Sequence, residues 1–185
     1  MGIDFANTEF VDKGQRVELL RSWSDVVSWL SEASLSTEAR LDEASADGLT
    51  EVHKFRKEWR QELEKISHGT HISGSFVKRL NRALERDVFA ELVVCPDGGN
   101  LQFERSQSKL KGEGLALAII ARQISKFLSD ADLVRIHKCA NPECVFYFYD
   151  STKSKCRQWC SAELCGNRHK VAAFRNRQAK KRSSK

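Results

Sequence analysis

Five of the six cysteines in this 185-residue chain lie within 27 residues of one another. Cys139 and Cys144 form one close pair, Cys160 and Cys165 form another, and fifteen residues separate the two pairs. Each pair spans one tight turn, so two sulfurs from each turn can meet one metal ion. The pattern C-x4-C, x15, C-x4-C therefore predicts a structural Zn²⁺ site, with four thiolate ligands and one ion per chain.

Other uses of these cysteines stay open on the sequence alone. Disulfides would require an exported protein, and the stretch MGIDFANTEF does not have the pattern of a signal peptide. An iron–sulfur cluster also takes four cysteines, but its usual spacings differ. Cys156 is a fifth thiol, and a thiol near the site would suit a redox switch. Because Cys156 lies outside both pairs, we place it outside the ligand set, with His137 and His169 as reserve ligands.

The second cysteine pair is predicted to lie at the start of the last helix. Ser161 is a suitable N-cap, and good helix-forming residues follow it. Cys160 would then precede the helix and Cys165 would lie in or just after its first turn, where the helix dipole favours a thiolate. With residues 145–149 as a strand between the pairs, the arrangement is typical of a treble clef.

The charge of the chain is as unevenly distributed as its cysteines. Residues 139–185 contain 11 Lys and Arg against 3 Asp and Glu, whereas residues 1–138 contain 20 against 22. This clustering favours contact with nucleic-acid phosphates, although a solvated helix or a solubilising tail would have the same composition. The basic residues of the last helix and tail are Arg168, Lys170, Arg175, Arg177, Lys180, Lys181 and Arg182.

Residues 1–134 are predicted to form a helical domain with one small β-hairpin, and residues 135–185 the zinc-binding domain. The fold class is therefore α+β and mainly α: a treble-clef-like finger with four cysteine ligands and a basic last helix follows the helical domain. We expect Ile3, Phe5 and Phe10 to pack onto this domain. Apolar spacing predicts helices over 17–33, 47–66, 73–86 and 112–128, a further helix start at 36–38, and a hairpin from strands at 89–95 and 101–104.

The helical domain contains no recognisable catalytic motif. It has no Gly-rich phosphate loop, no HExxH and no nucleophile elbow, and its histidines are scattered single residues. Asp4 and Asn7 could line a pocket or cap a helix, and Cys95 suits a buried apolar position. No apolar run reaches the roughly 18–20 residues of a membrane helix. We therefore expect a cytoplasmic protein without enzymatic activity and without membrane contact.

The C-terminal motifs resemble a known module, the CGNR zinc finger. The resemblance rests on FYDST at 148–152, WCS at 159–161, CGNR at 165–168 and the FRxR string that begins at Phe174. That finger usually follows an ABATE domain in proteins described as stress-induced transcription regulators. The opening string IDFANT, residues 3–8, is similar to the start of an ABATE domain.

The resemblance implies roles for individual residues. The zinc ligands would be the two cysteine pairs, and the Arg and Lys residues of the last helix would contact DNA. Gly166 would allow close backbone packing, Asn167 would cap or hold the zinc loop, and Arg168 would reach a phosphate or a buried partner. Trp159 would pack under the site. Cys156 departs from the family, in which Arg is common at that position.

The leading hypothesis is a zinc-containing transcription regulator that binds double-stranded DNA. Asn167, Arg168 or Arg175 would read bases, and the N-terminal domain would sense a small-molecule effector or dimerise. A homodimer is expected because one finger offers a small interface. The alternatives are an RNA-binding protein that stacks bases on residues 146–149, a protein-interaction module, or an enzyme domain targeted by the finger.

Overall fold

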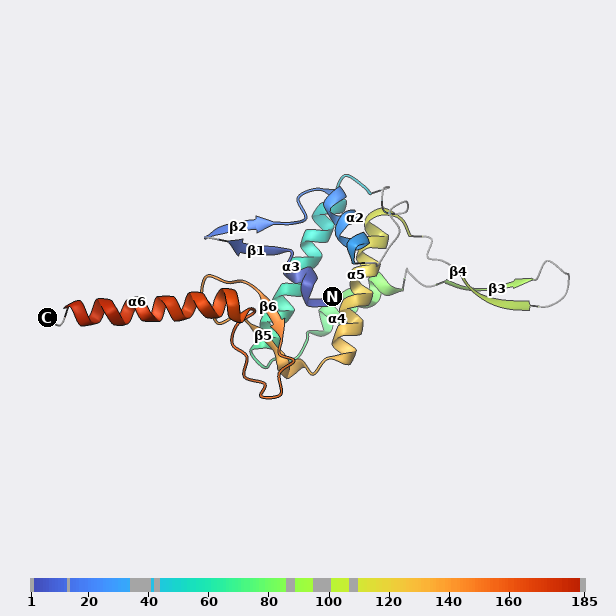
Figure 1. Cartoon of the computed structure of the whole chain (residues 1–185). Helices are drawn as coiled ribbons and strands as arrows, with labels where there is room; N and C mark the ends of the chain where they lie inside the picture. The colour runs from blue at the N-terminus through green and yellow to red at the C-terminus, as the bar shows by residue number, and fades with distance from the viewer. Residues whose placement is uncertain are drawn as a thin grey trace.

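A group of packed helices forms the body of the molecule, and the last helix projects from it (Figure 1). The computed structural model describes residues 2–12, 14–33, 41, 44–85, 89–94, 101–106 and 110–183; for 89–94, 101–106 and 179–183 it describes the backbone alone. The helices are α1 Gly2–Ala6, α2 Trp23–Glu32, α3 Gly48–Ser67, α4 Gly74–Leu84, α5 Gly112–Asp130 and α6 Asn167–Ser183. Short helical turns precede β5, at Leu133–Arg135, and α6, at Ala162–Gly166.

The described strands pair antiparallel, two by two. The pairs are β1 Glu9–Asp12 with β2 Gln15–Glu18, β3 Phe89–Val94 with β4 Leu101–Ser106, and β5 Ile136–Lys138 with β6 Tyr147–Tyr149. The β1–β2 pair is a tight hairpin in which Asp12 faces Gln15, and Gly14 provides the positive φ of +80° that its turn requires.

Helix α3 lies at the centre of the core, and its apolar side follows the expected spacing. Phe55, Trp59 and Leu63 of α3 are fully buried. The Phe76 ring of α4 stacks on Trp59 and Phe55, with ring centroids 5.6 and 5.9 Å apart. The Trp59 indole N–H donates to the Gly2 carbonyl at 2.7 Å, which fixes α1 against the core.

The strands of the C-terminal region are part of this core. Ile136 of β5 and Tyr147 of β6 are buried in the same apolar cluster as α3 and α5. The Asn7 side chain donates to the Tyr147 carbonyl at 2.9 Å and accepts from the Tyr147 N–H at 3.1 Å. The residue after α1 is therefore hydrogen-bonded to β6, and the C-terminal strands are fixed to the helical body.

Serine caps define where two helices begin. Ser22 accepts from the Asp25 N–H and the Asp25 carboxylate accepts from the Ser22 N–H, a complete capping box for α2. Ser73 accepts from the Phe76 N–H at the start of α4. Glu62 of α3 accepts from both the N–H and the hydroxyl of Ser73, which ties α4 to α3.

The expected fold class, α+β and mainly α, is confirmed. Helices α3, α4 and α5 lie where the spacing predicts them, and β3 and β4 form the expected hairpin. The predicted helix start at 36–38, Cys95 and the turn at 96–100 fall outside the described residues. Ile3 and Phe5 are buried as expected.

One helix prediction is wrong in part. Residues 17–33 were expected to be helical, but Val17 and Glu18 belong to β2, and α2 begins only at Trp23. The apolar spacing merged a strand and a helix, because the half-buried Val17 of β2 and Leu20, which is buried in the segment between β2 and α2, precede the buried residues of α2. Helix α1, the β1–β2 hairpin and β5 were not predicted.

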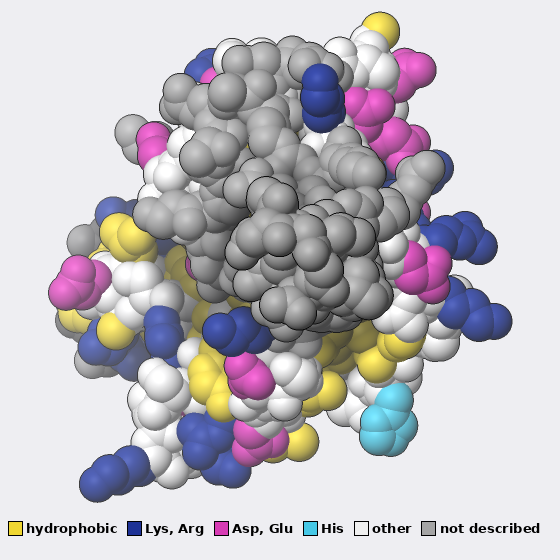
Figure 2. Space-filling view, turned by 90° about the vertical axis from the view of Figure 1, so that its right-hand side faces the viewer, with side chains coloured by type: hydrophobic (Ala, Val, Ile, Leu, Met, Phe, Trp, Pro, Cys, Tyr) yellow, Lys and Arg dark blue, Asp and Glu magenta, His cyan; other side chains and the backbone are white. Residues whose placement is uncertain are grey.

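Charges of both signs mix over the body. The face opposite α6 carries Lys and Arg side chains interspersed with Asp and Glu over its described surface (Figure 2). In the described part of the chain, no helix combines the length and apolar character that crossing a membrane requires.

Candidate metal centre

The four predicted cysteine ligands come together in space. The sulfurs of Cys139, Cys144, Cys160 and Cys165 all lie within 4.8 Å of one another. The Cys160 sulfur is 3.7 Å from that of Cys144 and 3.6 Å from that of Cys165. Tetrahedral zinc with Zn–S bonds of about 2.3 Å separates its sulfurs by roughly 3.8 Å. The spacing therefore fits one four-coordinate Zn²⁺, and four thiolates leave no open position for catalysis.

The first pair lies on a turn that follows β5. The Cys139 N–H donates to the Phe146 carbonyl at 2.9 Å, and the Cys144 N–H donates to the Asn141 carbonyl at 2.8 Å. The Asn141 side-chain oxygen accepts from the Glu143 N–H at 3.2 Å. This turn points both sulfurs to the same side.

The second pair lies where the sequence predicts it. Ser161 caps the turn Ala162–Gly166 and accepts from the Leu164 N–H at 3.2 Å. The Gly166 N–H donates to the Ser161 carbonyl at 3.0 Å, so the turn closes over five residues and is wider than an α-helical turn. Cys165 ends up buried on the inner side of this turn, facing the first pair.

Two N–H groups donate hydrogen bonds to the sulfurs. The Asn141 amide donates to the Cys165 sulfur at 3.6 Å, and the Cys160 N–H donates to the Cys139 sulfur at 3.5 Å. Such bonds orient the ligands and spread their negative charge. Asn141 was not singled out in the sequence, and the only available signal was its place between Cys139 and Cys144.

The electrostatics of the cluster call for a cation. Burial, together with the neighbouring cysteines, raises the pKa of Cys144 to about 11 and raises the pKa of Cys160 as well. Burial opposes ionisation of Cys165 too, but hydrogen bonds from Asn141 and the other cysteines lower the pKa of Cys165. Four thiolates this close repel one another, and Zn²⁺ supplies the charge that lets all four ionise.

A network of hydrogen bonds orders the loop that leads to the second cysteine pair. The buried Asp150 carboxylate accepts from the N–H and hydroxyl of Thr152 and from the Arg157 N–H, and these bonds lower the pKa of Asp150 to about 2. The Arg157 guanidinium lies 4.8 Å from the centre of the Phe148 ring and donates to the carbonyls of Trp159 and Cys160. Phe148, Asp150 and Thr152 of the motif FYDST thus make the contacts that fix the loop before Cys160.

The remaining thiol and the reserve ligands lie outside the cluster. Cys156 is exposed, and its sulfur contacts the Ser154 hydroxyl at 3.1 Å. The His137 ring packs on Phe148, and the His169 ring packs on Trp159 at a centroid distance of 4.7 Å. Their imidazoles therefore make apolar contacts beside the site and are not in the group of metal-ligating atoms.

The three residues after Cys165 have distinct surroundings. A Cβ on Gly166 would lie 3.3 Å from the Trp159 ring, so the expected close packing is present and Trp159 lies against the site. Asn167 is exposed at the start of α6. Arg168 forms an ion pair with Asp12 of the β1–β2 hairpin, with Nη2 and Oδ1 3.5 Å apart.

The basic residues of α6 extend away from this centre. The side chains of Arg168, Lys170, Arg175 and Arg177 are exposed, and α6 contains no acidic residue. Helix α6 continues to Ser183, but the side chains of Lys180, Lys181 and Arg182 lie outside the described part. The site therefore joins a rigid metal centre to an exposed cationic helix.

Two family models together match most of the chain. A model described as "Putative stress-induced transcription regulator", the ABATE domain, matches residues 1–131, and a model of the CGNR zinc finger matches residues 135–178. A search of curated proteins finds no match. Both models agree with the resemblance seen in the sequence, and neither family is described as an enzyme.

Proposed function

We propose that this chain, which belongs to the ABATE family and ends in a CGNR zinc finger, binds double-stranded DNA as a regulator of transcription. The observation that carries the proposal is α6, an exposed helix without acidic residues that starts at the zinc site and projects from a body of mixed charge (Figures 1 and 2). Phosphate contacts supply much of the affinity of such helices for DNA.

The spacing of the basic residues suits a duplex. Arg168 and Arg175 are seven residues apart and therefore lie on one side of α6, whereas Lys170 and Arg177 lie on another. A helix in the major groove lies close to both base edges and phosphates, so one basic row can face the bases while the row of Lys170 and Arg177 meets the phosphate backbone. Asn167, Arg168 and Arg175 are the proposed base-reading residues.

The aromatic strand gives little support to the RNA-binding alternative. Tyr147 and Phe148 are buried. The Phe146 ring packs on Phe10 and the Tyr149 ring packs on Phe127, with centroids 5.7 and 6.2 Å apart. Bases that stack on a protein need a free ring face, and these rings already pack within the body. The Lys and Arg residues of α6 therefore remain the main candidates for nucleic-acid contact.

Dimerisation is part of the proposal. Val171 and Phe174 are large apolar residues of α6 with exposed fractions of 48% and 55%. They lie between the two basic rows, and a second copy that packs on them would bring two fingers onto one DNA site. Analytical ultracentrifugation of the wild type and of Phe174→Ser tests this, and a monomeric wild type rejects it.

The DNA experiment is a titration of fluorescent duplex DNA at two salt concentrations, together with the zinc content of each sample. The wild type should bind one zinc per chain and lose affinity steeply with salt. Cys165→Ser should lose both zinc and DNA binding, whereas Cys156→Ser, which changes an exposed thiol outside the cluster, should keep both.

A charge-matched pair of variants locates the contact. Lys170→Gln with Arg177→Gln should reduce the slope of log affinity against log salt by roughly 1.8, since each phosphate contact contributes about 0.9. Lys54→Gln with Arg82→Gln removes the same charge from the body and should leave the slope unchanged. Equal effects of the two pairs would reject α6 as the interface and leave the finger as a protein-contact module.

A further inference from the structure

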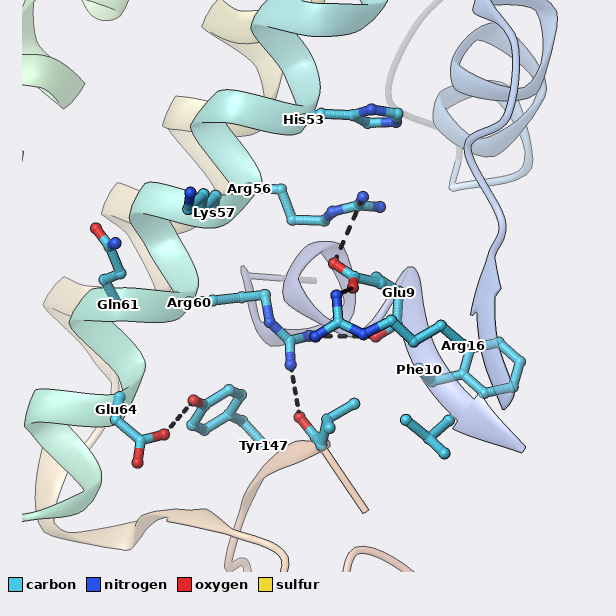
Figure 3. A pocket seen from close by; sticks show the side chains of 12 residues that line it. Glu9, Phe10, Arg16, His53, Arg56, Lys57, Arg60, Gln61, Glu64 and Tyr147 are labelled. Atoms are coloured by element: carbon cyan, nitrogen blue, oxygen red, sulfur yellow. Dashed lines mark hydrogen bonds and ion pairs between the residues drawn. The ribbon is translucent and has the colours of Figure 1, made fainter. Parts of the chain in front are cut away.

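A polar cavity lies where the body meets the zinc-binding region. It has a volume of about 520 Å³ and is lined by α3, the β1–β2 hairpin and residues Val145 and Tyr147 (Figure 3). This volume falls within the range of small-molecule sites, and a junction between domains is a common place for one. The zinc ligands do not line it.

The cavity has more positive than negative side chains. Arg16, Arg56, Lys57 and Arg60 line it, against the carboxylates of Glu9 and Glu64. Both carboxylates already have partners: Glu9 pairs with Arg16 at 2.8 Å, and Glu64 accepts from the Tyr147 hydroxyl at 2.5 Å and from Lys138. Glu9 also lies 3.8 Å from Arg56, and neither carboxylate pairs with Lys57 or Arg60.

Two cations in the cavity have no carboxylate partner among the described residues. The Arg60 guanidinium donates to the carbonyls of Ala6, Glu9 and Val145, at 2.5, 3.2 and 2.9 Å, and lies 5.6 Å from the Tyr147 ring centre. Lys57 forms no hydrogen bond or ion pair with the part of the chain that the structure describes, and it is one of the residues that line the cavity. An anion would balance both charges.

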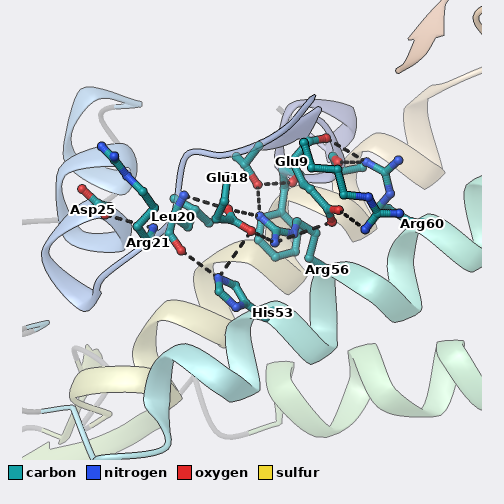
Figure 4. A network of polar contacts seen from close by, with 12 residues as sticks. Glu9, Glu18, Leu20, Arg21, Asp25, His53, Arg56 and Arg60 are labelled. Carbon is teal, nitrogen blue, oxygen red and sulfur yellow. Dashed lines mark hydrogen bonds and ion pairs between the residues drawn. The ribbon is translucent and has the colours of Figure 1, made fainter. Parts of the chain in front are cut away.

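The wall behind these cations is fixed. Arg56 is 4% exposed and donates to Thr8 at 2.8 Å and to both carboxylate oxygens of Glu18 (Figure 4). His53 contacts the Leu20 carbonyl at 2.7 Å beside the same network. A cavity whose charged wall is already ordered loses little entropy when a ligand binds.

The rest of the cavity is apolar. Phe10, Val11 and Val145 line it, and the Tyr147 ring faces it (Figure 3). Inorganic phosphate alone would leave these side chains without a contact. A ligand that carries an aromatic or short aliphatic group beside its negative charge would cover them.

We propose that this cavity binds a small organic anion, a carboxylate attached to an aromatic or short aliphatic group. The carboxylate meets Lys57 and Arg60, and the apolar group lies against Phe10 and Tyr147. The ligand would thus touch both the body and the zinc-binding region. The inference rests on the hypothesis that the N-terminal domain senses a small-molecule effector. It does not rest on DNA binding, because all the residues that line the cavity belong to the protein.

The test is an NMR titration of the ¹⁵N-labelled, zinc-loaded full-length chain with benzoate and salicylate, without DNA. We expect saturable shifts of the amide signals of Phe10, Lys57 and Tyr147. Benzamide has the shape of benzoate without its charge and should bind at least about tenfold more weakly. Inorganic phosphate, which lacks the apolar group, should also bind more weakly than either carboxylate.

Matched variants decide whether the cavity is the site. Lys57→Gln should weaken benzoate binding by about tenfold, whereas Lys54→Gln, one turn away on α3 and outside the cavity, should change it by less than about twofold. The proposal is overturned if no saturable shift occurs with either carboxylate up to about 10 mM. Equal effects of the two variants, equal binding of benzamide, or tighter binding of phosphate would overturn it as well.

Discussion

Arg168 of α6 and Asp12 at the tip of the β1–β2 hairpin form an ion pair, with Nη2 and Oδ1 3.5 Å apart. The hairpin that carries Asp12 also carries Phe10, Val11 and Arg16 of the cavity wall. The contact therefore connects the proposed ligand site to the first basic residue of the proposed DNA interface. It also occupies a guanidinium that is proposed to contact DNA.

Asp12→Asn should increase affinity for duplex DNA. Both partners are about half exposed, at 49% and 50%, so the pair is worth roughly 1 kcal/mol or less. Freeing Arg168 should raise the affinity about two- to fivefold at low salt, measured by fluorescence anisotropy. Asp47→Asn removes the same charge just before α3 and should have a smaller effect. Equal gains in both variants would mean that only net charge matters.

Asn7→Ala should loosen the junction between α1 and β6. The variant loses two hydrogen bonds to the Tyr147 backbone, at 2.9 and 3.1 Å, and leaves buried peptide groups without partners. We expect the free energy of unfolding in urea to fall by about 2 kcal/mol. Asn81→Ala on the exposed side of α4 should change it by less than about 0.5 kcal/mol. A similar loss in both variants would rule out a special role for the junction.

Glu18→Gln should change how stability depends on pH. Burial alone would raise the pKa of Glu18, but hydrogen bonds from Arg56 and the Leu20 N–H outweigh burial and hold the pKa below its ordinary 4.5. A lowered folded-state pKa contributes stability above pH 4.5 that is lost as the pH falls below it. The variant should therefore be less stable by about 2 kcal/mol at pH 7, because Arg56 is buried.

The difference between the wild type and Glu18→Gln should narrow as the pH falls below 4.5. Glu32→Gln, which changes an exposed carboxylate, is the control and should follow the wild type at every pH. A pH-independent difference would show that Glu18 acts through packing alone.

Zinc removal should unfold α6 while the helices of the body persist. Helix α6 packs on the turn Ala162–Gly166, and its like charges oppose an isolated helix. After chelation, the amide signals of 161–183 should collapse to random-coil positions, and those of α3 and α5 should stay dispersed. Added Zn²⁺ should restore the spectrum and Mg²⁺ should not. Persistence of the α6 signals without metal would contradict this.

The metal centre could be predicted from the sequence because the two cysteines of each pair are close together in the chain. Each cysteine pair is held by a turn of its own, and Ser161 marks the start of the second turn. Helices α3, α4 and α5 could equally be predicted, since each buries one side that repeats with the period of a helix.

Two of the parts that were not predicted, β5 and the cavity, depend on partners far away in the sequence. Strand β5 has only three residues, and it is defined by its pairing with β6 and by the burial of Ile136 against α3. The β1–β2 hairpin had one usable signal, Gly14 between two stretches with β-forming residues. The cavity could not be predicted at all, because Arg60 and Val145 are 85 positions apart.

The reach of α6 has a mechanical consequence. Its 17 residues span about 25 Å, so a rotation of roughly 10° at the zinc cluster would carry its far end through about 4 Å. That displacement exceeds the rise of one DNA base pair. In a dimer, a small rotation of each α6 at its zinc cluster would therefore change the distance between the two helix ends. The dimer could then match a different spacing of DNA half-sites while each α6 stays a straight helix.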